Sequence, residues 1–232
     1  RLAELHALRV PFAVQRTRRE DLLAIDKAVM LLSQLLPGLA PRARQLASRV
    51  AAVLEAAPWA PAVIHGDFSA DQVILAAAQC CFIDWDRATG GDPAADLGSF
   101  AARTEMQVID GTVSRSHADR ALEQLHEGYA GRREGSRQGR DRNPLPNAGP
   151  QTAAALLRLA GESFRRRLPD WPQREEALLD IVAQHAAPSA VEEACEHRLG
   201  HRRALVERDP HHQPGRRDAP FVAKAQREGP RC

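Results

Sequence analysis

The stretch from residue 63 to residue 100 decides the fold, and it reads VIHGDFSADQVILAAAQCCFIDWDRATGGDPAADLGSF. Two short apolar runs lie within it, Val73–Leu75 and Cys80–Ile83, and four residues separate them. Short apolar runs that are bounded by polar loops and joined by a brief connection are typical of a β-hairpin. The sequence therefore predicts one small hairpin, residues 73–83, between two acidic loops.

Polar side chains flank both strands of the predicted hairpin. Asp67 and Gln72 come just before the first strand, and Asp84 comes just after the second. Because a hairpin brings its two open ends together, we expect these three side chains to converge on one small volume. Carboxylate and amide oxygens are the ligands that Mg²⁺ prefers in proteins. The pattern therefore predicts a magnesium site with Gln72 and Asp84 as the metal ligands.

The spacing of these residues is also that of a phosphoryl-transfer site. Kinases use an aspartate that accepts the proton of the attacking hydroxyl, an amide about five residues later that holds metal, and a second aspartate after the next strand. Asp67, Gln72 and Asp84 occur in that order. We therefore expect Asp67 to be the catalytic residue.

Three motifs in this stretch carry a family resemblance: HGD at 65–67, IDW at 83–85 and GDPAADLG at 91–98. In this order they resemble the aminoglycoside phosphotransferase and choline kinase family, whose members have HGD loops, ID(F/W) turns and a GDP..DLA element. The resemblance implies transfer of the γ-phosphoryl group of ATP to a hydroxyl of a small molecule, with ATP and Mg²⁺ as cofactors. It implies an acceptor such as an aminoglycoside, choline or a sugar, and it does not choose among them.

The resemblance also assigns supporting residues. It implies that His65 props the catalytic loop, that Asp86 extends the second loop and that Asp96 braces the catalytic loop through hydrogen bonds. An alternative for Asp96 is a favourable acid in the first turn of the helix that Asp92 opens. The family usually has Asn where this chain has Gln72, which offers the same donors and acceptors on a side chain one methylene longer. No residue is assigned to the nucleoside part of ATP.

The fold class implied by the resemblance is mainly α with a small β-hairpin, as in the helical C-terminal lobe of a protein-kinase-like α+β fold. The opening LAELHA, residues 2–7, resembles the LA.LH helix that begins this lobe. Upstream of His65 the sequence has no Gly-rich phosphate loop and no lysine on a strand-like run. The expectation is therefore that an N-terminal ATP-binding lobe is missing from this chain or comes from a partner chain.

Apolar periodicity and end signals place the helices. Thr17 and Glu20 fit a capping box, which predicts a helix that begins there and stops at Pro37. Further helices are expected at about 41–57, from 93 onward, and at 119–129, 151–168, 174–186 and 189–206. Together residues 1–206 are expected to form the kinase-like helical lobe.

Two segments have few apolar residues. Residues 131–149 are rich in Gly, Arg and Pro, and we expect a mobile loop there. Residues 207–232 are expected to be a disordered tail. A possible metal face of Glu193, His197 and His201 is disfavoured, because a solvated charged face explains the same spacing and a fourth ligand is not evident.

Composition narrows the class of protein. The chain has 232 residues, 44% of them hydrophobic, and a formal net charge of +2. The near-neutral charge gives no case for nucleic acid or membrane partners, and no run approaches the roughly 18 apolar residues of a membrane span. The arginines of residues 131–142 are not interleaved with aromatic residues, which single-strand binders use for stacking. The four cysteines show no Cys-x-x-Cys spacing, so we expect reduced thiols and a cytoplasmic protein.

A second function remains open at this point. A kinase-like lobe that lacks its nucleotide-binding half fits a catalytically inactive binding or regulatory module as well as it fits an enzyme. The expected partner is a small-molecule substrate with a hydroxyl, rather than nucleic acid or a membrane.

We predict that the isolated 232-residue chain binds Mg·ATP only at about millimolar level, or about −4 kcal/mol. A metal held by one carboxylate and one amide keeps most of its waters, so it attracts the triphosphate little more than free Mg²⁺ does. Calorimetric titration at physiological salt measures this affinity. Micromolar binding would contradict the prediction and would require another segment to replace the small lobe.

Overall fold

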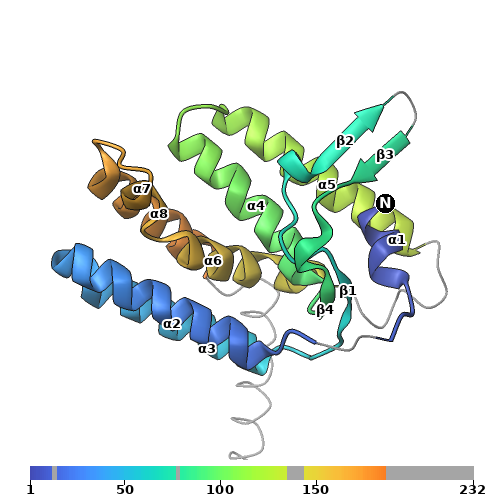
Figure 1. Cartoon of the computed structure of the whole chain (residues 1–232), viewed down its shortest axis with the longest axis horizontal. Coiled ribbons are helices and arrows are strands. Elements are labelled where there is room, and N and C mark those ends of the chain that lie inside the picture. Colours follow the sequence, from blue (N-terminus) through green and yellow to red (C-terminus); the bar gives the residue numbers. More distant parts are fainter. Residues whose placement is uncertain (12–14, 77–78, 135–143, 187–232) are drawn as a thin grey trace, which may run out of the picture. The chain divides into compact units, whose positions relative to one another are not determined.

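The computed structural model describes residues 1–11, 15–76, 79–134 and 144–186 (Figure 1). Its helices are α1 (Leu2–Ala7), α2 (Arg18–Leu35), α3 (Ala40–Ala56), α4 (Ala94–Ile109), α5 (Arg115–Glu134), α6 (Ala148–Leu159), α7 (Glu162–Arg165) and α8 (Trp171–His185). Its strands are β1 (Ala62–Ile64), β2 (Val73–Ala76), β3 (Gln79–Phe82) and β4 (Thr89–Gly91). The 3-10 turns are η1 (Pro37–Leu39), η2 (Ala70–Gln72), η3 (Trp85–Arg87) and η5 (Leu145–Asn147). The prediction of a mainly α fold with a small hairpin is confirmed.

The hairpin forms where the sequence placed it. β2 and β3 pair antiparallel, with Val73 opposite Phe82 and Ala76 opposite Gln79. Beyond the last pair, the backbone amide of Ile83 donates to the Gln72 carbonyl at 3.0 Å, which closes the open end of the hairpin. The hairpin projects away from the helices in Figure 1, and Leu75 is 76% exposed.

A second strand pair was not predicted. β1 and β4 pair antiparallel, with Ala62 opposite Gly91 and Ile64 opposite Thr89. Each strand has three residues, and two of those in β4 are glycines, so the side chains of this pair carry almost no strand pattern. A Cβ at Gly91 would lie 2.6 Å from the Ile64 side chain, so the close approach depends on glycine at this position.

The helices enclose the main apolar core. α2 lies beside α3, and α6 contacts α2, α3, α4 and α8 (Figure 1). The largest fully buried aliphatic side chains at these contacts are Ile25, Leu32, Val50, Leu156, Leu157, Leu178, Leu179 and Val182. A Cβ at Gly98 would lie 2.5 Å from the Gln151 backbone, so the small size of this residue lets α4 and α6 pack closely.

The predicted start signals of two helices are present. The Thr17 hydroxyl accepts from the Glu20 amide at 3.3 Å, and the Glu20 carboxylate accepts from the Thr17 amide at 2.7 Å. This confirms the capping box of α2. At α4 the Asp92 carboxylate accepts from the Ala94 amide at 2.9 Å, which satisfies one of the unpaired amides of the first turn.

The region after α5 differs from the sequence prediction. One helix was expected over residues 151–168, but α6 ends at Leu159 and the short α7 follows. Gly161 between them has φ +80°, a left-handed conformation that suits glycine and ends the helix. Phe164, which lies in α7 after this break, is 42% exposed. α8 begins at Trp171 rather than at residue 174, with Pro172 in its first turn.

The expected loop at 131–149 is helical at both described ends. α5 continues to Glu134, and η5 and α6 begin at Leu145 and Ala148. Proline suits the first turn of a helix, so the Pro-rich sequence at 144–150 is compatible with these starts. Residues 135–143, the expected helix at 189–206 with Glu193, His197 and His201, and the tail at 207–232 lie outside the described residues.

We predict that Glu175→Gln stabilises the protein more at pH 8 than at pH 4.5. Burial raises the pKa of Glu175 on α8. A raised folded-state pKa contributes stability that is present below the unfolded pKa and is lost as pH rises through the folded pKa. Glutamine removes that loss, so the gain in the free energy of unfolding should grow with pH. Urea unfolding at both pH values measures it.

The neighbouring Glu176 on α8 is exposed, so Glu176→Gln is the matched control and should change stability little at either pH. An equal effect of Glu175→Gln at both pH values would contradict the prediction, because it would show a packing effect without proton linkage.

Candidate active site

The loop that carries Asp67, the expected catalytic residue, is here called the catalytic loop. It begins where the buried strand β1 ends. His65, Gly66 and Asp67 follow Ile64 directly, and η2 then leads to β2. Gly66 has φ +84°, and a Cβ on it would lie 2.2 Å from the carbonyl oxygen of Arg87 in η3. A side chain cannot be accommodated at that distance. The loop that carries Asp67 and the turn that follows Asp84 are therefore in direct backbone contact.

A buried carboxylate holds the catalytic loop. Asp96 in the first turn of α4 accepts hydrogen bonds from the backbone amides of His65 at 2.7 Å and Gly66 at 2.9 Å. Its Oδ2 also lies 3.0 Å from His6 Nε2, which donates to it. His6 Nδ1 in turn lies 2.7 Å from the Tyr129 hydroxyl. Asp96 therefore links α1, α4, α5 and the loop, which agrees with the bracing role that the family resemblance implied.

His65 links the loop to the open end of the hairpin. Its Nε2 donates to the Ile83 carbonyl at 2.8 Å. Its ring is fully buried and packs against three aromatic rings, those of Phe68, Phe82 and Trp85, with centroids between 4.9 and 6.4 Å away. A buried ring with this hydrogen bond fits a structural support rather than a base that must reach a substrate.

The two expected metal ligands are neighbours. Gln72 Nε2 donates to Asp84 Oδ2 at 3.2 Å across the open end of the hairpin. Asp84 has φ +60°, a left-handed conformation that Asp tolerates better than most residues. This hydrogen bond uses the side-chain amide nitrogen of Gln72. It leaves the side-chain carbonyl oxygen of Gln72 and the second carboxylate oxygen of Asp84 available as hard oxygen ligands for a metal.

This donor set fits Mg²⁺, which is held by one or two protein oxygens and completes its shell with water and phosphate. Among the described residues there is no cluster of three His, Cys, Asp or Glu side chains that could enclose a metal. Asp86, the supporting residue expected next to this pair, lies exposed in η3.

Asp67 lies beside two guanidinium groups. Its side chain is 34% exposed, and its oxygens lie 3.8 Å from Arg87 Nε and 4.0 Å from Arg103 Nη2. Arg103, on α4, also pairs with Glu162 at 3.2 Å. Sequence reasoning missed both arginines, because only the packing of α4 and η3 brings them to the loop.

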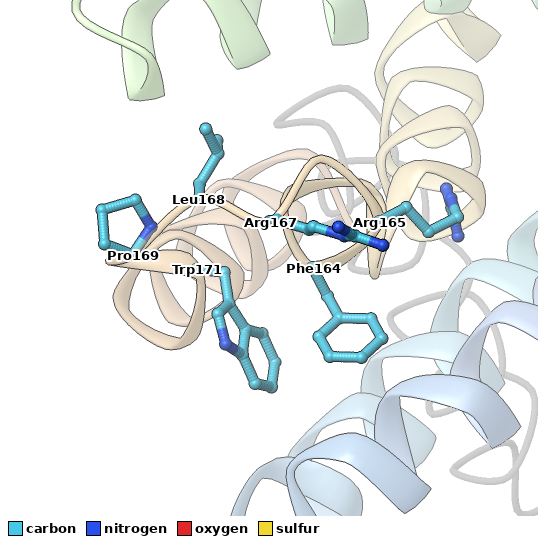
Figure 2. Close-up of a pocket in the computed structure, with 6 residues that line it drawn as sticks. All are labelled: Phe164, Arg165, Arg167, Leu168, Pro169 and Trp171. Atoms are coloured by element: carbon cyan, nitrogen blue, oxygen red, sulfur yellow. The ribbon is translucent and has the colours of Figure 1, made fainter.

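An open pocket lies elsewhere, between α7 and the start of α8. Figure 2 shows the rings of Phe164 and Trp171 side by side at its wall, with centroids 5.1 Å apart. Its lining residues are Phe164, Arg165, Arg167, Leu168, Pro169 and Trp171. None of the site residues expected from the sequence belongs to this lining.

A family model described as the phosphotransferase enzyme family matches residues 1–137. The chain belongs to this phosphotransferase family. The resemblance read from residues 65–98 is therefore confirmed. No match was found among curated proteins.

Solved structures share the fold. A choline/ethanolamine kinase family protein from Mesorhizobium loti is 17% identical with a TM-score of 0.54, and the match covers 79% of this chain and 59% of that chain. A glucosamine kinase is 18% identical with a TM-score of 0.49, covering 72% of this chain and 44% of that one. This phosphotransferase-family chain thus spans little more than half the length of the kinase family protein, and it has the helical lobe of a kinase-like fold.

One finding concerns membranes. In the part of the phosphotransferase-family chain that the structure describes, no helix combines the length and the apolar character needed to cross a bilayer.

We predict that Asp96→Asn loosens the catalytic loop. Asparagine turns one acceptor oxygen into a donor, which would face one of the amide or imidazole donors that Asp96 now accepts. The cost of the unpaired group is about 1–3 kcal/mol. Urea unfolding measures the loss of stability, and hydrogen exchange measures the expected loss of protection at the His65 and Gly66 amides.

Asp180→Asn is the control, because Asp180 makes only an exposed pair with Arg42 among the described ion pairs. It should leave the protection of the loop amides unchanged. Unchanged amide protection in Asp96→Asn would show that the loop is held by other contacts.

Proposed function

We propose that this chain is the acceptor- and metal-binding part of an ATP-dependent phosphotransferase. It moves the γ-phosphoryl group to a hydroxyl of a small molecule. The family resemblance suggests an aminoglycoside, choline or a sugar as this acceptor. The observation that carries the proposal is the fixed loop: Asp96 and His65 hold Asp67 next to the hairpin end where Gln72 and Asp84 pair.

Asp67 is proposed to position the acceptor hydroxyl and take its proton. As the hydroxyl oxygen bonds to phosphorus and the bond to the ADP oxygen breaks, the proton passes to a carboxylate oxygen of Asp67. Arg87 and Arg103 place positive charge within 4.0 Å of this carboxylate. Fixed charges of this kind stabilise negative charge that develops on a transferring phosphoryl group.

Gln72 and Asp84 are proposed to hold Mg²⁺ through the side-chain carbonyl oxygen of Gln72 and a carboxylate oxygen of Asp84. When bound there, the ion neutralises and orients the phosphates of ATP. The hydrogen bond between the two side chains shows that the longer glutamine side chain reaches Asp84 from the position where the family has asparagine.

The same hydrogen bond supports a second candidate function. The side-chain amide nitrogen of Gln72 already donates to Asp84, so the two residues form a stable pair without any ion. A kinase-like module that binds a small molecule without transferring phosphate would keep this arrangement. The two functions differ in one observable: only the enzyme releases ADP when a hydroxyl acceptor is added.

We predict that, in the protein supplied with its N-terminal ATP-binding lobe, Asp67→Asn lowers turnover by roughly 10² or more, the scale for losing a general base. Asp84→Asn should abolish activity together with its Mg²⁺ dependence. ADP release is measured with a panel of amino sugars, amino alcohols, sugars and hydroxy acids. Asp71→Asn is the control, because Asp71 is an exposed acid in the same segment, four residues after Asp67.

Wild-type turnover in both Asp67→Asn and Asp84→Asn would refute the site assignment. Absence of ADP release with every acceptor, while Mg·ATP still binds, would favour the binding module.

A further inference from the structure

A second charged cluster lies next to the catalytic loop. Arg16, just before α2, forms an ion pair with Asp21 on α2. Arg158 on α6 reaches the same oxygen, with its Nη1 4.0 Å from Asp21 Oδ1. Asp21 is buried. One buried carboxylate therefore serves two guanidinium groups, and the cluster of these three residues keeps an excess positive charge.

Arg158 has unused hydrogen-bonding capacity. Its Nη1 is shielded from solvent and has no hydrogen-bond partner among the described residues. Burial, and then the charge of Arg16, lower the pKa of Arg158 to about 10, against the opposing effect of Asp21 and Asp67. A buried donor without an acceptor costs free energy, and guanidinium donors suit carboxylate and phosphate oxygens. The side chain keeps 19% exposure through atoms other than Nη1, so an anion would have to approach the guanidinium from that side and displace its cover to reach Nη1.

The cluster lies at the Asp67 end of the site. Arg16 Nη1 is 3.5 Å from the carbonyl oxygen of Gly66, the residue before Asp67, and the Arg16 amide donates to Gly90 in β4 at 2.9 Å. The negative charge of Asp67 also acts on Arg158. The expected metal ligands instead pair at the open end of the hairpin. An anion bound by the cluster would thus lie near the acceptor hydroxyl.

We propose that Arg158 and Arg16 form an anion-binding subsite for the acceptor, so that the acceptor carries a carboxylate or phosphate group besides its hydroxyl. The inference rests on the proposed function, which it narrows from small alcohols in general to acidic ones. Arg158 supplies the unpartnered Nη1 donor of a planar guanidinium group, whose shape suits such anions, and Arg16 adds charge. A cationic acceptor would be repelled here, since Asp21 already pairs with both arginines.

The direct test titrates the full chain with sodium phosphate and with sodium acetate at constant ionic strength and follows the thermal unfolding midpoint. We expect a saturable rise with at least one of these probes. Arg158→Gln should weaken that binding at least tenfold, and Arg158→Lys should weaken it less because the charge remains. Arg42→Gln is the control, because Arg42 pairs with Asp180 on the surface.

If Arg158→Gln fails to fold, as judged by circular dichroism, Arg16→Gln replaces it with the same expected loss. A rise that does not saturate in the wild type, or that persists in the folded variants, would overturn the proposal. It would make the cluster a structural ion network only.

Mg·ATP distinguishes the two sources of a phosphate group. Phosphate or acetate binding that is unchanged by saturating Mg·ATP assigns the subsite to the acceptor, as proposed. Competition between them would assign the arginines to the nucleotide and overturn the proposal.

A kinetic test separates this inference from the proposed function. Hydroxy acids are compared with alcohols that lack the acid group, and Arg158→Lys should raise KM for the hydroxy acid while leaving KM for the alcohol nearly unchanged. Efficient transfer only to neutral or cationic alcohols would overturn the subsite and keep the phosphotransferase. Saturable anion binding without any ADP release would keep the subsite and remove the enzyme.

Discussion

The buried carboxylate of Asp96 is the interaction on which the site depends. It accepts from two successive backbone amides of the catalytic loop and from the His6 imidazole. An ionised carboxylate can be buried only if its acceptor positions are satisfied, and these donors come from segments 31 and 90 residues away from it in sequence. The same contact that makes the burial of Asp96 tolerable therefore fixes the backbone from which Asp67 extends.

Charge is distributed unequally around that loop. The hairpin end holds an amide and a carboxylate that pair with each other. Arginines of η3 and α4 instead lie beside Asp67, and those of α6 and of the segment before α2 lie beside Asp21. A phosphoryl donor with its metal and an acidic acceptor would meet the hairpin end and these arginines separately. A fold does not determine a substrate, so such local differences in charge, rather than the helical scaffold, are the features that would distinguish acceptors.

Features with a local signal could be predicted from the sequence. The capping box of Thr17 and the hairpin near Val73 depend on residues within a few positions of one another. The pairing of β1 with β4 could not be predicted, because Gly90 and Gly91 have no side chains to show a strand pattern. Within the site, the order of Asp67, Gln72 and Asp84 was visible as a motif. Arg103 reaches Asp67, and Arg158 reaches Asp21, only through the packing of the helices, so the spacing of these residues in the chain carries no such signal.

Gly66 has a mechanical consequence. Its α-carbon lies against the backbone of Arg87, so the loop of Asp67 and the turn after Asp84 touch through their backbones, with no side chain between them. A displacement of the hairpin end would then be transmitted to Asp67 with little slack. Because Asp96 also holds the loop amides, Asp67 and the Gln72–Asp84 pair are tied to each other and to α4.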